Sequence, residues 1–130
     1  MATAAVDSNT NGSAVFKMIF DAGSQLHAAD VPFLWSTTTS YPDANNQTIA
    51  EILTSYFVSF AVTHDPNPLR AANAPFWPSY ISGGTGDIAN GESVGFTALE
   101  ISNTDVGPIP DPDVNGRCDF FAGHGMDVGN

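Results

Sequence analysis

Residues 15–33 read VFKMIFDAGSQLHAADVPF, and this stretch decides the fold class that the chain predicts. The segment 15–20 is short and mostly apolar, and Asp-Ala-Gly at 21–23 closes it, so it predicts a buried β-strand. A strand that is apolar on both faces usually lies inside a sheet covered on two sides. A turn of small residues follows and carries His27. The imidazole is therefore expected at the carboxyl end of a strand, where α/β sheets place their active sites.

The longest element that the pattern predicts is a helix over about 46–63. Apolar side chains recur there at i, i+3, i+4, i+7 and i+8, the spacing of one helix face. The predicted buried face contains Ile49, Ile52, Leu53, Tyr56, Phe57, Phe60 and Ala61, and the predicted solvent face contains Glu51, Thr54, Ser55 and Ser59. One side chain among Asp43, Asn45 and Asn46 is expected to cap its start. The prolines of 65–68 end it, because proline cannot continue the hydrogen-bond ladder.

The rest of the chain predicts few regular elements. A second strand is expected at 94–101, whereas 71–91 is rich in Ala, Asn, Pro and Gly and is expected to be loop. A turn-rich connector is expected at 108–112, and 1–13 is expected to be a flexible N-terminal segment. Nothing near the strand at 15–20 pairs obviously with it. One helix and isolated strands bury their faces poorly against each other, which indicates the edge of a larger α/β layer arrangement.

The composition narrows the classes of function. The chain has 130 residues, enough for one ordinary domain, and 42% of them are hydrophobic. Its 14 acidic and 3 basic residues give a net charge of −11, which disfavours nucleic acid or an anionic membrane surface as a partner. No apolar run is long enough for a membrane span, and 1–13 lacks the features of a signal peptide. Asn11 and Asn46 begin glycosylation sequons, which often occur by chance.

Cysteine and histidine usage gives little sign of further chemistry. Cys118 is the single cysteine, so it pairs with a cysteine outside this chain or packs as a thiol. The three histidines, His27, His64 and His124, lack metal-ligand spacing, and neither a metal nor another cofactor is expected. His64 is expected at the C-terminus of the helix, where an imidazole complements the helix dipole.

His27 lies in the string LHAADVPF, residues 26–33. This string resembles the pattern around the catalytic histidine of type-B carboxylesterases and lipases. In that pattern a glycine, a small residue, an acid and an apolar pair with proline follow the histidine. Asp30 fills the acidic position, and the Val-Pro-Phe of this chain fills the apolar one. Ala28 stands where the family usually has glycine.

Three further segments fall in the order of the same family. Residues 57–68, FVSFAVTHDPNP, resemble its aromatic-x-x-Phe-Ala stretch leading to Asp-Pro-Asn. Residues 76–80, FWPSY, resemble its Trp-Pro-x-Tyr segment, and residues 117–121, RCDFF, resemble the tail of fungal members. Each motif is modest alone, but four in this order between Phe16 and Phe121 make a specific resemblance.

The resemblance implies a C-terminal fragment of an α/β-hydrolase fold over 14–130. That part would carry the last sheet strand, the histidine loop, the C-terminal amphipathic helix and an irregular tail. It also implies hydrolysis of a small-molecule carboxylic ester by a Ser-His-Glu/Asp triad, with His27 as the catalytic histidine. The chain order Ser, acid, His places the nucleophile in the missing N-terminal part of the domain, which is the expected partner. This chain alone is expected to be inactive, and the parent family is extracellular.

One local pattern resembles the missing nucleophile. Residues 91–95 read Gly-Glu-Ser-Val-Gly and match the G-x-S-x-G elbow. That elbow needs a buried strand before the serine and a helix after it. Here the polar stretch 83–90 precedes the serine, and a strand-like run follows. The serine also comes after His27, against the chain order of the family. We therefore do not expect Ser93 to be the nucleophile.

The alternative class is a non-catalytic module, such as a small secreted binding protein or a hydrolase remnant reused for contacts. In that case the aromatic pair Trp77 and Tyr80 is a candidate for ligand stacking. An isolated hydrolase piece is also expected to be poorly soluble, because its strand at 15–20 would present an unpaired edge and apolar surface.

Overall fold

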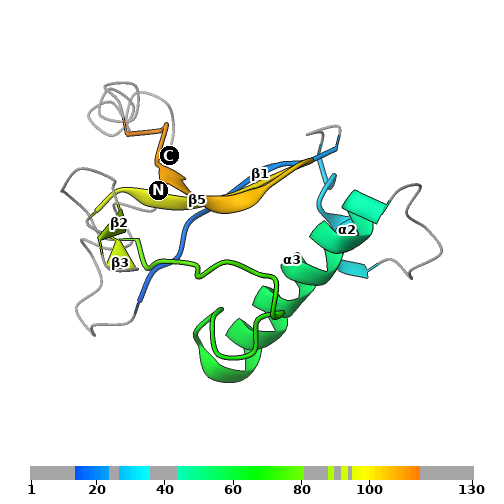
Figure 1. The fold of residues 1–130 in the computed structure, drawn as a ribbon, viewed down its shortest axis with the longest axis horizontal. Helices are drawn as coiled ribbons and strands as arrows, with labels where there is room; N and C mark the ends of the chain where they lie inside the picture. The colour runs from blue at the N-terminus through cyan, green and yellow to red at the C-terminus, as the bar shows by residue number, and fades with distance from the viewer. Residues whose placement is uncertain are drawn as a thin grey trace, which may run out of the picture.

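In the computed structural model, residues 14–23, 27–35, 44–80, 88–89, 92–93 and 95–114 are described. A three-stranded sheet forms one layer, and the long helix α3 lies beneath it (Figure 1). The sheet contains β1 (Met18–Asp21), β4 (Thr97–Ser102) and β5 (Val106–Pro110), and the helices are α2 (Val31–Trp35) and α3 (Ala44–Thr63). A separate small hairpin pairs β2 (Ile88–Ala89) with β3 (Glu92–Ser93). The sheet is mixed, because β1 and β4 are parallel whereas β4 and β5 are antiparallel, and with its helices it gives the class α/β.

The expected first strand exists, but it begins later and has a neighbour in this chain. β1 pairs in parallel with β4, with Met18 opposite Leu99 and Phe20 opposite Ile101. Just before β1 the carbonyl of Lys17 still accepts the amide of Leu99, but the carbonyl of Val15 accepts the amide of Tyr80 instead, at 2.7 Å. The expectation that its neighbours lie elsewhere is thus wrong for one edge. The strand is also half-buried rather than buried.

The strand β4 begins three residues after its expected start, and β5 replaces the expected connector. Phe96, with φ +43°, bends the chain just before β4. In β5, Pro108 and Pro110 alternate with residues whose backbone N–H and C=O groups point toward β4. Asp111 continues this alternation, because its amide donates to the carbonyl of Phe96 at 2.7 Å. The prolines therefore point their nitrogens away from β4 and remove no ladder bond, which is the position that proline tolerates at a sheet edge.

The helix α3 confirms the prediction of a long helix. It ends at Thr63, where His64 adopts a left-handed conformation with φ +61° and donates its amide to the carbonyl of Phe60 at 2.8 Å. This is a common way to end a helix, and the prolines of 65–68 follow it. The predicted cap among Asp43, Asn45 and Asn46 lies outside the described side chains.

The buried face of α3 matches the prediction in its first half only. Ile49, Ile52, Leu53 and Tyr56 are buried and pack with Leu99 and Ile101 of β4, and they form the centre of the core. In the second half, Phe57, Phe60 and Ala61 are exposed and Ser59 is fully buried, so the predicted sides are exchanged there. The cause is the chain that returns after the helix, which covers the serine side.

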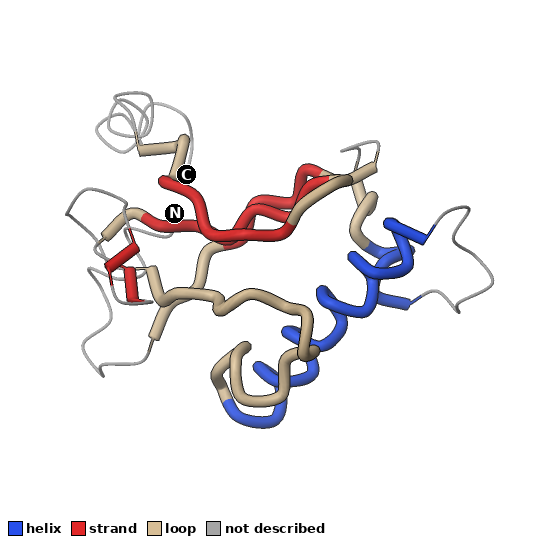
Figure 2. Tube along the Cα trace, viewed as in Figure 1, coloured by secondary structure: helices blue, strands red, loops and turns tan. Residues whose placement is uncertain are grey.

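Ser59 fixes that returning chain to the helix. Its hydroxyl donates to the carbonyl of Asp65 at 2.7 Å and accepts the amide of Leu69 at 3.1 Å. Asn67 then clamps the segment further along, because its side chain bonds both the amide and the carbonyl of Trp77, at 2.8 and 2.9 Å. The segment 71–80, held by these bonds, leaves the end of α3 and runs beneath the sheet toward the hairpin of β2 and β3 (Figure 2).

The aromatic cluster at 76–80 belongs largely to the core. Trp77 and Tyr80 are buried, with 7% and 3% of their surfaces exposed. The indole Nε1 of Trp77 donates to the carbonyl of Lys17 at 3.2 Å, and its ring stacks edge-on against Tyr56. Both rings are thus part of the core, and a ligand-stacking role for the pair stays a prediction.

Several expectations fall outside the described residues. These are the flexible segment 1–13, the tail motif 117–121, Cys118 and His124. In the part of the chain that is described, no helix has the length and apolar character that a membrane crossing requires.

Candidate active site

His27 lies in the turn that follows β1. The strand ends at Asp21, and Gly23 turns the chain with φ +70° before the described residues resume at His27. The side chain of His27 is exposed, and no hydrogen bond or ion pair joins it to another described residue. The turn lies at the carboxyl end of β1, beside the start of α2 (Figure 1). The imidazole is thus available to a group that is not among the described residues.

The backbone beside His27 has an unusual conformation. Ala28 has φ +63°, in the left-handed region, and its carbonyl accepts the amide of Val31 at 3.2 Å. Glycine adopts this conformation freely, whereas a Cβ atom makes it costly. Ala28 is also the position where the resembled family usually has glycine. The left-handed conformation is therefore kept here at the expense of strain.

The short helix α2 anchors the histidine turn to the core. The carbonyl of Asp30 accepts the amides of Phe33 and Leu34 at 3.0 and 3.3 Å, which closes the single turn. Phe33 is buried and packs edge-on against Phe20 of β1, with ring centroids 5.3 Å apart. Its carbonyl accepts the hydroxyl of Thr54 on α3 at 3.3 Å. Both layers of the fold therefore fix the position of the turn.

Ser93 does not lie in a nucleophile elbow. It belongs to β3, where it pairs with Ile88 in the two-residue hairpin. The next described element is the strand β4, not a helix. An elbow requires a strand followed directly by a helix. The expectation that Ser93 is not the nucleophile agrees with this geometry.

The other titratable candidates do not gather around His27. His64 is exposed at the end of α3, the location that the sequence predicted for it. No group of three His, Cys, Asp or Glu side chains that could hold a metal ion occurs among the described residues.

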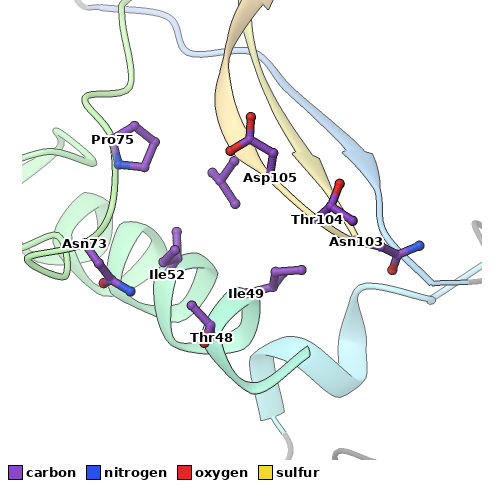
Figure 3. A pocket seen from close by; sticks show the side chains of 9 residues that line it. Thr48, Ile49, Ile52, Asn73, Pro75, Asn103, Thr104 and Asp105 are labelled. Atoms are coloured by element: carbon purple, nitrogen blue, oxygen red, sulfur yellow. The ribbon is translucent and has the colours of Figure 1, made fainter. Parts of the chain in front are cut away.

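A cavity of about 220 Å³ lies between the first half of α3 and the turn that joins β4 to β5 (Figure 3). Isoleucine side chains of α3 form its floor, and amide, hydroxyl and carboxylate groups of the turn form its rim. The lining residues are Thr48, Ile49, Ile52, Asn73, Pro75, Asn103, Thr104, Asp105 and Val106. His27 does not line it, so this cavity does not bring a substrate to the imidazole.

A buried ionic cluster fastens the two ends of the described chain. The ammonium of Lys17 lies 2.6 Å from Asp111 and 2.8 Å from Asp113, and the hydroxyl of Tyr80 donates to Asp111 at 2.9 Å. Burial alone would lower the pKa of Lys17, but the hydrogen bonds and charges of the two carboxylates raise it above its usual value. Burial alone would likewise raise the pKa of Asp111, but the hydrogen bonds from Lys17, Asp113 and Tyr80 lower it.

Sequence patterns alone do not predict this cluster. The one available signal was Lys17, a single cation inside an otherwise apolar strand, which implied an acidic partner without locating it. Tyr56 has a similar structural role, because its hydroxyl donates to the carbonyl of Pro75 at 2.5 Å. Burial raises the pKa of Tyr56 to about 12, against a smaller opposing effect of Arg70. Neither the ionic cluster around Lys17 nor Tyr56 is suited to proton transfer near neutral pH.

Comparison with known proteins gives a likeness of fold. No protein-family model matches the chain, and no curated protein sequence matches it. Among solved structures, the crystal structure of Aspergillus niger EstA superposes with a TM-score of 0.64 at 19% sequence identity. The match covers 88% of this chain and 23% of that chain, so the chain spans about a quarter of the solved protein. The α/β fold of this chain is therefore similar to part of an esterase.

Proposed function

We propose that this chain is the histidine-bearing part of a carboxylic ester hydrolase, with His27 as its general base and acid. One observation carries the proposal. In a chain with an esterase-like fold, His27 lies exposed at the carboxyl end of a parallel strand. In α/β sheets this is the edge at which catalytic side chains gather.

The chemistry assigned to His27 is proton transfer. One ring nitrogen would take the proton of a serine hydroxyl as the serine attacks the ester carbonyl. The same nitrogen would then return a proton to the oxygen of the leaving alcohol. The serine, the acid that orients the imidazole and the oxyanion hole are proposed to come from the N-terminal part of the hydrolase domain. The substrate class is a small carboxylic ester.

The surroundings of His27 support this role. A general base must be held in place and must still reach its proton donor. Phe33 and the turn at Ala28 hold the backbone that follows His27, while the side chain itself stays exposed.

A turnover assay of the chain alone tests the assignment. We expect that a serine-directed organophosphate does not change the rate at which the chain alone hydrolyses p-nitrophenyl butyrate. A lone histidine contributes only general-base catalysis, typically about 10²–10⁴-fold, and this needs no serine. Organophosphate-sensitive turnover by the isolated chain would show that it has a nucleophile of its own. The proposed division of the triad would then fail.

A non-catalytic module is the second candidate. The observation in its favour is that the side chain of His27 is exposed and no hydrogen bond or ion pair joins it to another described residue. The DNA upstream of the Met1 codon separates the two candidates. A continuous reading frame with a strand, a G-x-S-x-G motif and a helix favours the esterase, whereas a stop codon and a promoter favour the module.

A further inference from the structure

The second half of α3 presents an apolar face that no described element covers. Phe57 and Phe60 are 45% and 47% exposed. By contrast, the apolar residues in the first half of α3 are buried in the core. Beside them lies an apolar hollow of about 180 Å³. Its walls are Phe16, Tyr56, Phe57, Phe60, Pro66 and Trp77.

The walls of this hollow are rigid and offer almost no polar atoms. Phe16 packs edge-on against both Phe60 and Trp77, with ring centroids 6.1 and 6.0 Å apart. The Tyr56 hydroxyl and the Trp77 indole N–H both donate to backbone carbonyls, so neither is left for a ligand. An occupant must therefore be apolar at this point, because a buried polar group would find no partner.

An open strand edge adjoins the hollow. Phe16 lies two residues before β1, and the carbonyl of Lys17 accepts the amide of Leu99 at 2.9 Å. The alternation of a strand then directs the backbone groups of Ile19 and Asp21 toward β4, and those of Met18 and Phe20 away from it. In the described part of the sheet, β1 is the edge strand, with order β1-β4-β5. Its outward groups can accept a further strand.

We infer that this edge and the hollow form one docking surface, here called the edge–hollow surface, for a strand and its apolar side chains. The occupant is the remaining part of an esterase-type α/β domain, an inference that rests on the proposed function. The superposition supports this choice, because more than three quarters of the matched esterase lies outside the matched region. A second copy of this chain is disfavoured as the specific occupant, because each copy carries a net charge of −11, so that copies alone associate only unspecifically at high concentration.

Co-expression tests the docking. The probe is the part of Aspergillus niger EstA that lies outside the match, produced as a separate chain. We expect light scattering to detect a complex with one copy of each chain. Phe60→Asp places a charge in the apolar wall of the hollow, and Met18→Pro removes an outward amide of the strand edge. Each should weaken the affinity of the complex about tenfold or more. Val114→Asp is the matched control, because Val114 is 45% exposed and follows β5 at the other edge of the sheet.

Two results would overturn the inference: no complex with the probe, or equal weakening by Val114→Asp. Hydrogen exchange of the chain alone, diluted until light scattering detects only the monomer, gives a second test that needs no variant. The amides of Met18 and Phe20 should exchange fast while those of Ile19 and Asp21 are protected. Equal protection of all four amides would mean that the edge is already occupied, by this chain or by a second copy, and would refute the docking surface.

The same preparations separate this inference from the proposed function. A complex that forms without organophosphate-sensitive ester hydrolysis supports the edge–hollow surface and refutes the esterase role of His27. Hydrolysis that appears and is unaffected by both Phe60→Asp and Met18→Pro supports the esterase role and refutes the surface.

Discussion

The Cβ atom of Ala28 strains the left-handed backbone conformation of the turn that carries His27. The residue holds φ +63° and accepts the Val31 amide within the turn. The sequence pointed to this position, because the resembled family usually has glycine there. It could not reveal that the left-handed conformation persists with alanine, since this depends on the anchoring of Phe33 in the core.

Ala28→Gly should therefore stabilise the fold. Left-handed φ costs an L-residue roughly 1–2 kcal/mol, and the added freedom of glycine in the unfolded chain offsets part of the gain, so we expect about 0.5–1 kcal/mol. The measurement is the free energy of unfolding in dilute denaturant titrations. The matched control is Ala29→Gly, which lacks a positive φ and should destabilise or leave stability unchanged. Equal effects of the two variants would refute the strain.

The two acids that hold Lys17 should differ in their contribution to stability. The side chain of Asp111 is 1% exposed and that of Asp113 is 60% exposed. Asp111→Asn removes the partner of a mostly buried ammonium and should cost about 2–4 kcal/mol. Asp113→Asn removes a surface partner and should cost less than about 1 kcal/mol. Chemical denaturation at neutral pH measures both, and a similar cost for the two would contradict the geometry.

The pH dependence of this cluster follows from the two pKa directions. The pKa of Asp111 is lowered in the fold, so its contribution is present above the unfolded value and is lost as pH falls through the folded value. The pKa of Lys17 is raised, so its contribution is present below its unfolded value and is lost as pH rises through the folded one. The stability difference between wild type and Asp111→Asn should thus shrink in acid. A difference independent of pH would exclude the ionic contribution.

At the scale of elements, α3 shows what periodicity predicts and where it fails. Its existence, length and first-half buried face follow from the apolar spacing. The second half departs because Ser59 is buried under a loop that bonds to it, and hydrogen bonds to a distant loop leave no trace in helical periodicity. The strand β5 was missed for a related reason. Its prolines predict a turn, and only the register of the sheet shows that their nitrogens lie on the side of β5 that does not pair with β4.

Ser59→Ala tests the exchanged faces of α3. The change removes the acceptor of the Leu69 amide, whereas the Asp65 carbonyl keeps the hydroxyl of Thr63 as a donor, so we expect a loss of about 1–2 kcal/mol. Val62→Ala, on a helix position that is 68% exposed, should change stability by less than about 0.5 kcal/mol. Thermal unfolding of the two variants gives the comparison. A loss for Ser59→Ala no larger than that for Val62→Ala would contradict the burial of Ser59 under the returning loop.

At the scale of the whole molecule, the described residues form a core but leave the edge–hollow surface open. The sequence predicted the α/β class and a piece of a larger arrangement from the shortage of paired elements. For the role proposed for His27 the sequence predicted the histidine but no partner, because a triad is assembled from segments far apart in sequence.

The open surface should make the isolated chain associate. Exposed strand edges and apolar patches favour unspecific, open-ended association. Light scattering should show particle mass rising with concentration, and Phe60→Asp should reduce the rise, whereas Val114→Asp should reduce it less. A wild-type chain that stays a monodisperse monomer at high concentration would contradict the expectation.

The assignment of His27 is the central claim, and ester hydrolysis by the co-expressed pair tests it most directly. The pair should hydrolyse p-nitrophenyl butyrate, and an organophosphate should abolish this. His27→Gln should lower the rate by a factor on the order of 10⁴–10⁶. His64→Gln, which changes an exposed histidine at the end of α3, should leave the rate unchanged. Hydrolysis that survives His27→Gln, or a stable pair without hydrolysis, would contradict the account.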